Sequence, residues 1–423
     1  MKYYLVFLII YVFGLFTTKC NSQINNNSRQ PINGIEFDYS SVNILEKINE
    51  AWQVSWDRFY HPKTNQFYDY LVSYEKGKEL THLPTAEEVA NLYPNHNGYD
   101  TGMEDCMISA GIMLCMIIDK YYATKDEELK KNAYEVFKGI EKSTSAHDSK
   151  GFVARGVCVE DSKSIYIGSS RDQITHAVYG LWHYYHSPLS SSEIKNEIGG
   201  ILSSIANRAE QNVVPSNNYN FLRADGTPDN LLKMWENDGH EVARLPMIYA
   251  AAWETTGELK YFDLYQKYIV EAVKESFIDV SKVNSWALLQ MQSSFELLIS
   301  IEKDPDLKMQ MAKIMQMVSK EAEVRVRTAN NNTSKYDLTM VATDWRNGGG
   351  IKWDSEYRHM WYSIREVGEA ALMQLLDENH SFSKEQESLL FQTIAKIDYN
   401  KVSTSGIFYL QGAYWKGKHR ELF

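Results

Sequence analysis

The sequence predicts an all-α fold, an (α/α)6 toroid formed by a single domain over residues 41–423. Helical periodicity recurs in pairs of segments joined by short turns, as in helical hairpins. Loops of roughly 20 to 30 residues precede the first helix of most pairs, and long loops in a compact domain are usually functional. The first helices are expected to begin near residues 102, 172, 240, 284 and 356, mostly at intervals of about 70, whereas solenoid repeats usually span about 34 to 47 residues with uniform short loops.

A lone helix is expected over residues 41–60, where apolar side chains recur at helical spacing. The hairpins are expected at 102–122 with 127–142, 172–186 with 192–211, 240–255 with 259–275, 284–301 with 305–324, and 356–376 with 383–397. Pro305 suits a first helical position, and Gly257 suits a hairpin turn. A short helix is expected near 86–92, and residues 403–415 look partly extended. The lone helix and the five hairpins make eleven helices, which is close to the twelve of a toroid.

Composition excludes some classes of partner and cofactor. The 423 residues are 44% hydrophobic and 13% aromatic, which is enough for one large core. The net charge of −11, without a long run of like charges, argues against nucleic acid as a partner. Histidines and cysteines show no metal-ligand spacing, and Gly348-Gly349-Gly350 is not followed by a phosphate-loop Lys. The sequence therefore predicts neither a metal nor a cofactor.

Residues 1–20 resemble a targeting segment, with Lys2 followed by an apolar run and then by small and polar residues up to Cys20. The protein is therefore expected to be exported, to the periplasm or the cell surface. Cys20 suits lipidation, which would attach the protein to a membrane through a polar tether at residues 21–40, but Lys19 before it departs from the usual small residue. Simple cleavage nearby is the alternative.

The segment from Ser164 to Ser187 runs from a polar loop directly into an aromatic amphipathic helix. Ser169 and Ser170 suit the N-cap, which places Asp172 in the first turn, where free backbone N–H groups favour an anion. A carboxylate there can be a capping charge and nothing more. A catalytic role for Asp172 gains support because acids also occur at the start of the first helix in other hairpins.

In a toroid, the starts of the first helices and the long loops meet at one face, so the residues there form a candidate site. Acids, Trp and Arg at one concave end suit saccharide binding and cleavage, since two carboxylates flank the bond, aromatic faces stack on rings and Arg binds sugar acids. The substrate-binding candidates are Arg171, His176, Trp235, Glu236, Asp238, His240, Trp345, Arg346, Trp353, Glu356 and Arg358. Trp235, Trp345 and Trp353 are expected at this mouth, and Trp182, Trp253 and Trp361 in the core.

Two motifs, Tyr99-Asp100-Thr101-Gly102-Met103 and Ser170-Arg171-Asp172-Gln173, resemble those of six-hairpin glycosidases, above all the unsaturated glucuronyl and rhamnogalacturonyl hydrolases and related glucuronidases. Tyr99 stands where that family usually has His, and Met103 where it has Phe. The resemblance implies a catalytic Asp172, which protonates the unsaturated sugar and then activates water. It also implies that Asp100 orients ring hydroxyls, with Asp105 as the substitute for Asp100.

The leading interpretation is an exported glycoside hydrolase that acts on oligosaccharides containing uronic acid. A polysaccharide lyase is the first alternative, with a base among His176, His240, Tyr166 and Tyr179 and a neutralising Arg155 or Arg171. The second is a glycan-binding lipoprotein without catalysis. Several acids at one site count against a pure binder, because each must be desolvated. The sequence leaves the oligomeric state open.

Overall fold

The computed structural model describes residues 39–348 and 354–423. The targeting segment with Cys20, all but the last residues of the tether, and Trp353 lie outside the described residues. Within that part of the chain, twelve long helices alternate between an inner and an outer position, which confirms the predicted all-α (α/α)6 toroid. The assignment of residues 41–423 to one domain stays a prediction.

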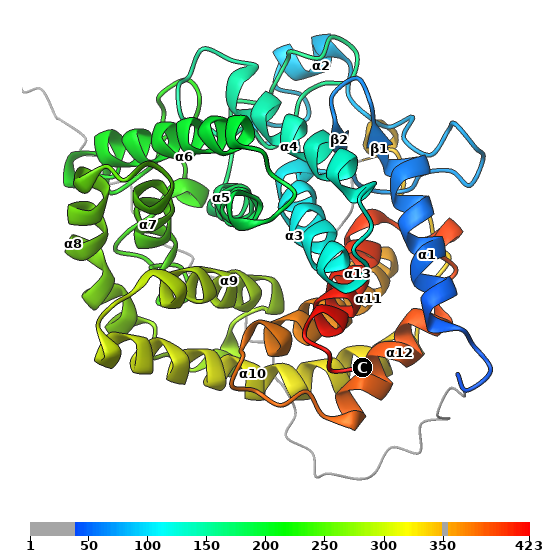
Figure 1. The fold of residues 1–423 in the computed structure, drawn as a ribbon. Coiled ribbons are helices and arrows are strands. Elements are labelled where there is room, and N and C mark those ends of the chain that lie inside the picture. Colours follow the sequence, from blue (N-terminus) through cyan, green and yellow to red (C-terminus); the bar gives the residue numbers. More distant parts are fainter. Residues whose placement is uncertain (1–38, 349–353) are drawn as a thin grey trace, which may run out of the picture. The chain divides into compact units, whose positions relative to one another are not determined.

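The inner helices form a closed ring, because each contacts the next and the last contacts the first (Figure 1). They are α3 Cys106–Thr124, α5 Arg171–His186, α7 Arg244–Thr256, α9 Ser285–Ile301, α11 Glu356–Leu376 and α13 Thr404–His419. The outer helices are α1 Ile44–Val54, α4 Leu129–Ser145, α6 Ser192–Asn212, α8 Leu259–Glu275, α10 Pro305–Thr333 and α12 Lys384–Lys396. Figure 1 shows α5 and α7 on the inner side of α6 and α8.

Short elements lie in the loops. They are the π-helix Ser55–Phe59, strands β1 Tyr60–His61 and β2 Gln66–Phe67, α2 Ala86–Ala90, and 3-10 turns at Pro215–Asn217, Asn230–Leu232, Val280–Lys282, Trp345–Asn347 and Tyr399–Lys401. The two strands pair antiparallel and form the one sheet of the described residues. The loops are thus built of turns, and the helices carry the fold.

Local signals fix several helix ends where the sequence predicts them. Ser170 caps α5 by accepting a hydrogen bond from the backbone N–H of Gln173, and Asp304 caps α10 ahead of Pro305. Gly257 ends α7 with a φ of 74°, which a side chain would make unfavourable. Five of the six inner helices, α3, α5, α7, α9 and α11, begin within four residues of the predicted starts.

Two expectations were wrong. Residues 403–415 are not extended but belong to α13, the sixth inner helix, and α10 continues to Thr333 instead of ending at 324. The inner helix α13 is buried on nearly every side from Thr404 to Trp415. A helix buried all round lacks the alternation of polar and apolar faces from which helices are predicted, and its aromatic and β-branched residues imitate a strand.

Helices α3 and α5 approach closely because glycines face each other at their crossing. A Cβ on Gly111 would lie 2.3 Å from the carbonyl oxygen of His176, and a Cβ on Gly180 would lie 2.9 Å from Cα of Gly111. Real Cβ atoms do not approach other atoms so closely. The crossing therefore brings the first turns of both helices to the same place.

Replacing Gly111 with alanine is expected to destabilise the protein by about 1–3 kcal/mol, because the backbones of α3 and α5 must separate. The matched control is Gly200→Ala in α6, where an added Cβ meets nothing within 4 Å. That control should stabilise by about 0.5–1 kcal/mol through helix propensity. Urea unfolding of both variants measures the difference, and equal stabilities would show that the crossing tolerates a methyl group.

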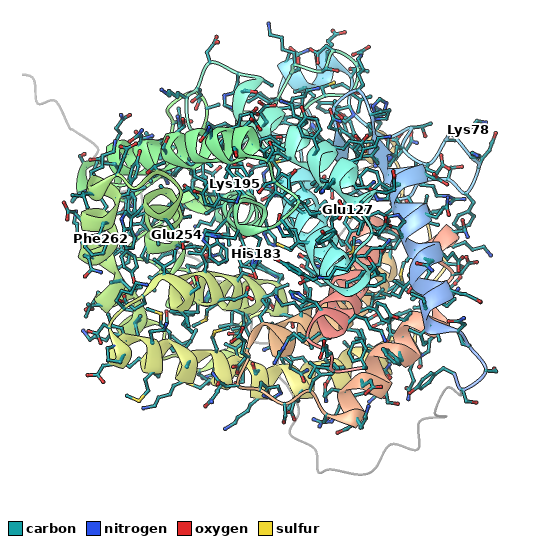
Figure 2. The ribbon with its side chains drawn as sticks, in the orientation of Figure 1. Lys78, Glu127, His183, Lys195, Glu254 and Phe262 are labelled. Carbon is teal, nitrogen blue, oxygen red and sulfur yellow. The ribbon has the colours of Figure 1, made fainter. Side chains whose placement is uncertain are left out.

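A partly buried charged cluster lies at the end of the ring where the inner helices finish. Glu296 of α9 lies 3.2 Å from Nζ of Lys416 and 3.4 Å from Nε2 of His183, and it accepts a hydrogen bond from Tyr179. Burial alone would raise the pKa of Glu296, but these partners outweigh burial and hold that pKa far below its usual range. Figure 2 shows His183 at the middle of the ring. A cavity of about 50 Å³ remains there.

Within the described residues, α3 is the one helix that is long and apolar enough to cross a membrane by length and composition. Its most apolar window is 72% buried inside the structure. An apolar helix at the centre of a toroid meets the same criteria, so these properties are explained by its place in the core.

Candidate active site

A cavity of about 660 Å³ opens where the inner helices begin. Its lining comes from the starts of α3, α5, α9 and α11 and from the loops before them, so these predicted helix starts do converge on one face. The start of α7 joins them because Arg244 bonds to Asp172. The start of α13 joins them as well, since Thr404 and Ser405 donate hydrogen bonds to Asp69, next to the lining residue Tyr70.

Carboxyl groups from two neighbouring helices line one wall of the cavity: Asp100, Glu104, Asp105 and Asp172. The side chains of Asp105 and Asp172 are 19% and 25% exposed, so a ligand can reach them. Neither is explained by capping. Asp105 makes no side-chain cap bond at the start of α3, and Ser170 performs that role for α5. Gln173 of α5 donates to Asp105 over 3.0 Å and thereby joins the two helix starts.

Glu104 is almost fully buried. It accepts hydrogen bonds from the backbone N–H groups of Asp100 and Gly102 and from the hydroxyl of Tyr70, at 2.8 to 3.0 Å. These bonds hold a turn in which Asp100 and Gly102 have φ values of 71° and 78°. Burial, and then the adjacent charge of Asp105, raise the pKa of Glu104 to about 8. Glu104 therefore holds a proton at neutral pH.

A closed set of ion pairs fixes Asp172. Arg244 of α7 is fully buried, and its Nη1 donates to Oδ1 of Asp172 over 2.6 Å, while its Nε lies 3.0 Å from Glu241. Glu241 accepts in turn from Nε of Arg171 over 2.9 Å, and Nε2 of His240 lies 3.3 Å away. Arg171 and Asp172 are adjacent at the start of α5, and Glu241 and Arg244 lie near the start of α7. Two ion pairs, Arg171–Glu241 and Asp172–Arg244, therefore join the starts of these two helices. Burial would raise the pKa of Glu241, but Arg244, His240 and Arg171 outweigh burial and keep that pKa well below its usual range.

The wall formed by α11 is cationic and aromatic. Arg358, Trp361, Tyr362 and Arg365 all line the cavity, and they follow the i, i+3, i+4, i+7 spacing of one helix face. The guanidinium of Arg358 lies 4.8 Å from the Trp361 ring and 4.9 Å from the Tyr362 ring, which is cation–π geometry. Arg365 pairs with Glu369 over 2.5 Å. All four residues of this wall belong to α11, which is far in sequence from the acids of the cavity.

The other aromatic groups of the cavity come from three further segments. Tyr70, Tyr99 and Trp286 line it. The guanidinium of Arg155 lies 4.8 Å from the Tyr99 ring centre, and its Nη2 donates to the Tyr99 hydroxyl over 3.1 Å. Arg155 also lies 3.7 Å from Asp105. Flat apolar faces beside carboxylates give the cavity the chemical character of a saccharide site.

Four of the predicted site residues meet in this cavity: Asp100, Asp105, Asp172 and Arg358. Arg171 and His240 lie next to it, since both bind Glu241. His176 is buried one turn below Asp172, where its Nδ1 lies 2.9 Å from the Asp172 carbonyl oxygen. Burial lowers the pKa of His176 to about 4, so this imidazole is neutral.

The expected places of several tryptophans were wrong. Trp345 is buried outside the cavity, where its indole N–H donates to the carbonyl oxygen of His82, and Trp235 packs against Tyr268 of α8. Trp361 is buried, as expected of a core residue, and it also lines the cavity. Long loops bury apolar side chains of their own, so a Trp in a loop need not face the mouth. Trp182 is buried as expected, while Trp253 is only partly buried against Phe262.

The remaining candidates do not line the cavity either. Arg346 forms ion pairs with Glu88 and Asp344 that fasten one loop to another. The side chains of Glu236, Asp238 and Glu356 are exposed to solvent outside the lining. Exposed acids in a loop or a first helical turn are explained by solvation and by the helix dipole.

The prediction missed Tyr70, Tyr362 and Arg365 and assigned Trp361 to the core. Trp361, Tyr362 and Arg365 could have been found from the sequence, because they share one helix face with Arg358. Tyr70 could not, because its segment has no helical or strand periodicity. Among the described residues, no group of three or more His, Cys, Asp and Glu side chains is arranged to hold a metal ion.

The unusual pKa of Glu104 predicts a pH-dependent stability. A carboxyl that titrates at about 8 in the folded state and near 4.5 when unfolded stabilises the fold below pH 4.5 and loses that contribution as the pH rises to about 8. The unfolding free energy of the wild type, minus that of Glu104→Gln, should therefore fall over this interval. Urea unfolding at pH 4.5, 6 and 8 measures it. A difference that is constant with pH would contradict the raised pKa.

The chain matches no protein-family model and no curated protein sequence. Among solved structures it is similar to a sugar epimerase from a ruminal bacterium, with 15% identity, a TM-score of 0.47, and coverage of 88% of this chain and 98% of that chain. It is also similar to the GH76A α-1,6-mannanase from Salegentibacter sp. HEL1_6, with 13% identity, a TM-score of 0.36, and coverage of 78% and 100%.

A third similar structure is the glycoside hydrolase family 76 mannosidase Bt3792 from Bacteroides thetaiotaomicron VPI-5482, with 12% identity, a TM-score of 0.32, and coverage of 80% of this chain and 100% of that chain. Similarities this distant carry no argument about activity. The fold assignment rests on the ring of helices itself, and the finer resemblance to glucuronyl hydrolases stays a prediction.

Proposed function

We propose that this protein is a glycoside hydrolase that cleaves oligosaccharides containing acidic sugars in the cavity at the helix starts. One observation carries the proposal: two reachable carboxylates, Asp105 and Asp172, lie on neighbouring inner helices in a cavity with aromatic faces. Hydrolysis of a glycosidic bond needs a proton for the leaving oxygen and a second carboxylate for the attacking water or the sugar cation. The volume of about 660 Å³ suits an oligosaccharide segment.

The contacts of the carboxyl groups suggest how the roles are divided. Glu104 holds a proton at neutral pH and is the group best suited to supply it. Asp172 is ion-paired with Arg244, so it acts as the carboxylate that accepts a proton from the attacking water. Asp105 also lines the cavity, where its negative charge would stabilise the positive charge on the sugar ring.

Export completes the proposed function, because extracellular polysaccharides supply such oligosaccharides. It rests on the targeting character of residues 1–20. Lipidation of Cys20 is part of the same proposal. Mass spectrometry of the mature protein from its membrane fraction would detect a diacylglyceryl Cys20, and a soluble product cleaved elsewhere would rule the anchor out.

The lyase alternative fits the contacts less well. Tyr166 donates its hydroxyl to the backbone of Tyr93, and Tyr179 lies with the cluster at the opposite end of the ring. The imidazole of His176 does not line the main cavity, and His240 is paired with Glu241. The candidate bases of a lyase therefore either bond to other groups or lie outside the cavity lining. The carboxylates, by contrast, are part of that lining.

One assay separates the reactions. The protein is incubated with saturated and with lyase-generated uronic-acid oligosaccharides, while reducing ends and the ultraviolet absorbance of the unsaturated uronide are both followed. New reducing ends without new absorbance, or a loss of absorbance from the lyase products, are expected. A gain of absorbance from saturated substrates would identify a lyase, and no change with any substrate would remove the proposed function.

A further inference from the structure

The α11 wall has a hydrogen-bond donor for which the described residues offer no acceptor. Trp361 is 4% exposed and lines the cavity, yet its buried indole N–H has no hydrogen-bond partner within the described residues. Buried polar groups are nearly always paired, and leaving one unpaired has a cost in free energy. A bound ligand with an acceptor at this place would remove that cost.

Two cations stand on either side of this donor. The guanidiniums of Arg358 and Arg365 lie 4.8 and 5.2 Å from the Trp361 ring centre, and both residues line the cavity. The aromatic rings of Trp361 and Tyr362 keep both guanidiniums close to α11. Arg365 is held in addition by Glu369, whose pKa is raised by burial to about 7 despite the nearby guanidinium.

The part of the lining that carries the acids does not favour an anion. Asp100, Asp105 and Asp172 would repel it, and the guanidinium of Arg155 there already donates to the carbonyl oxygen of Glu104 and to Tyr99. An acidic group on a bound sugar is therefore favoured beside Arg358 and Arg365 of α11.

We propose that Arg358, Trp361 and Arg365 form a subsite on α11 that binds the anionic group of the saccharide, a carboxylate or a sulfate ester. The subsite deepens the proposed function, on which it rests, by assigning the acidic substituent of the substrate a place on α11. Guanidinium groups and an N–H donor match the planar oxygens of a carboxylate, and they also match a sulfate. The subsite makes the enzyme selective for acidic over neutral sugars.

Binding can be measured without turnover, by titration calorimetry with glucuronate, glucose 6-sulfate and glucose. The wild type should bind at least one anionic sugar more tightly than glucose, and the tighter anion identifies the natural substituent. Arg358→Gln and Trp361→Phe should each weaken that anion by about 10- to 100-fold and change glucose little, because each removes a donor to a charged group. Arg365 is left intact, since its loss would leave Glu369 buried without its partner.

Matched substitutions control for unspecific effects. Arg327→Gln removes a guanidinium from an exposed pair with Glu385, and Trp253→Phe alters a Trp that packs on Phe262; both lie outside the cavity lining. These controls should bind as the wild type does. Equal affinity for the anionic and neutral sugars, or unchanged anion affinity in both subsite variants, would overturn the subsite.

The outcomes also separate this subsite from the proposed hydrolysis. Anion binding that is lost in Arg358→Gln and Trp361→Phe, in a protein that cleaves no glycoside, would keep the subsite and remove the hydrolase. Cleavage of acidic oligosaccharides with unchanged kinetics in both variants would keep the hydrolase and remove the subsite.

Discussion

Replacing Asp172 with asparagine is expected to lower kcat by about 10²- to 10⁴-fold, the usual effect of removing general acid or base catalysis. Asparagine keeps the size of the side chain and an oxygen that can still accept from Arg244. It cannot accept the proton of the attacking water. Substrate should therefore still bind, with little change in KM, while turnover nearly stops. Steady-state kinetics on a substrate that the wild type cleaves gives the result.

Two controls show whether the loss is specific. Asp148→Asn, in an exposed loop away from the cavity lining, should keep wild-type kcat. Circular dichroism should show the same helical content for all three proteins. If Asp172→Asn keeps near wild-type kcat, Asp172 only organises the helix start, and the catalytic pair must be sought among Glu104, Asp105 and Asp100.

Replacing Arg244 with methionine is expected to reduce the free energy of unfolding by about 3–5 kcal/mol, since removing one partner of a buried ion pair leaves the other charge uncompensated. Arg244 is fully buried and lies within 3.0 Å of both Asp172 and Glu241. Without it Glu241 keeps Arg171 and His240 as partners, whereas Asp172 loses its ion pair. The starts of α5 and α7 would then lose one of their two connections.

Urea unfolding of Arg244→Met against Arg327→Met tests this effect. Arg327 pairs with Glu385 on an exposed face, where an ion pair contributes about 0–1 kcal/mol. A loss below about 1 kcal/mol in both variants would contradict the role of Arg244, because its pair would then be as weak as an exposed one.

Local chemistry explains why the hairpins could be predicted. Most of the helices carry an apolar stripe, and their ends carry caps such as Ser170, Asp304 and Gly257 that act within a few residues. Acids near the first turn of an inner helix are equally local, so Asp100, Asp105 and Asp172 could be found without the structure. Helix α13 could not, because an inner helix surrounded by others has no polar face to reveal its period.

The sequence by itself therefore determined the pairing of helices, the face on which the long loops gather and the acids that stand there, since each depends on contacts between residues close in the chain. Only the tertiary structure decided which of these side chains share a cavity. Arg244 reaches Asp172 from another helix, Trp345 turns into a neighbouring loop, and α11 presents Trp361 to the cavity. Such contacts join residues far apart in sequence and are fixed by the closure of the ring, which no local pattern records.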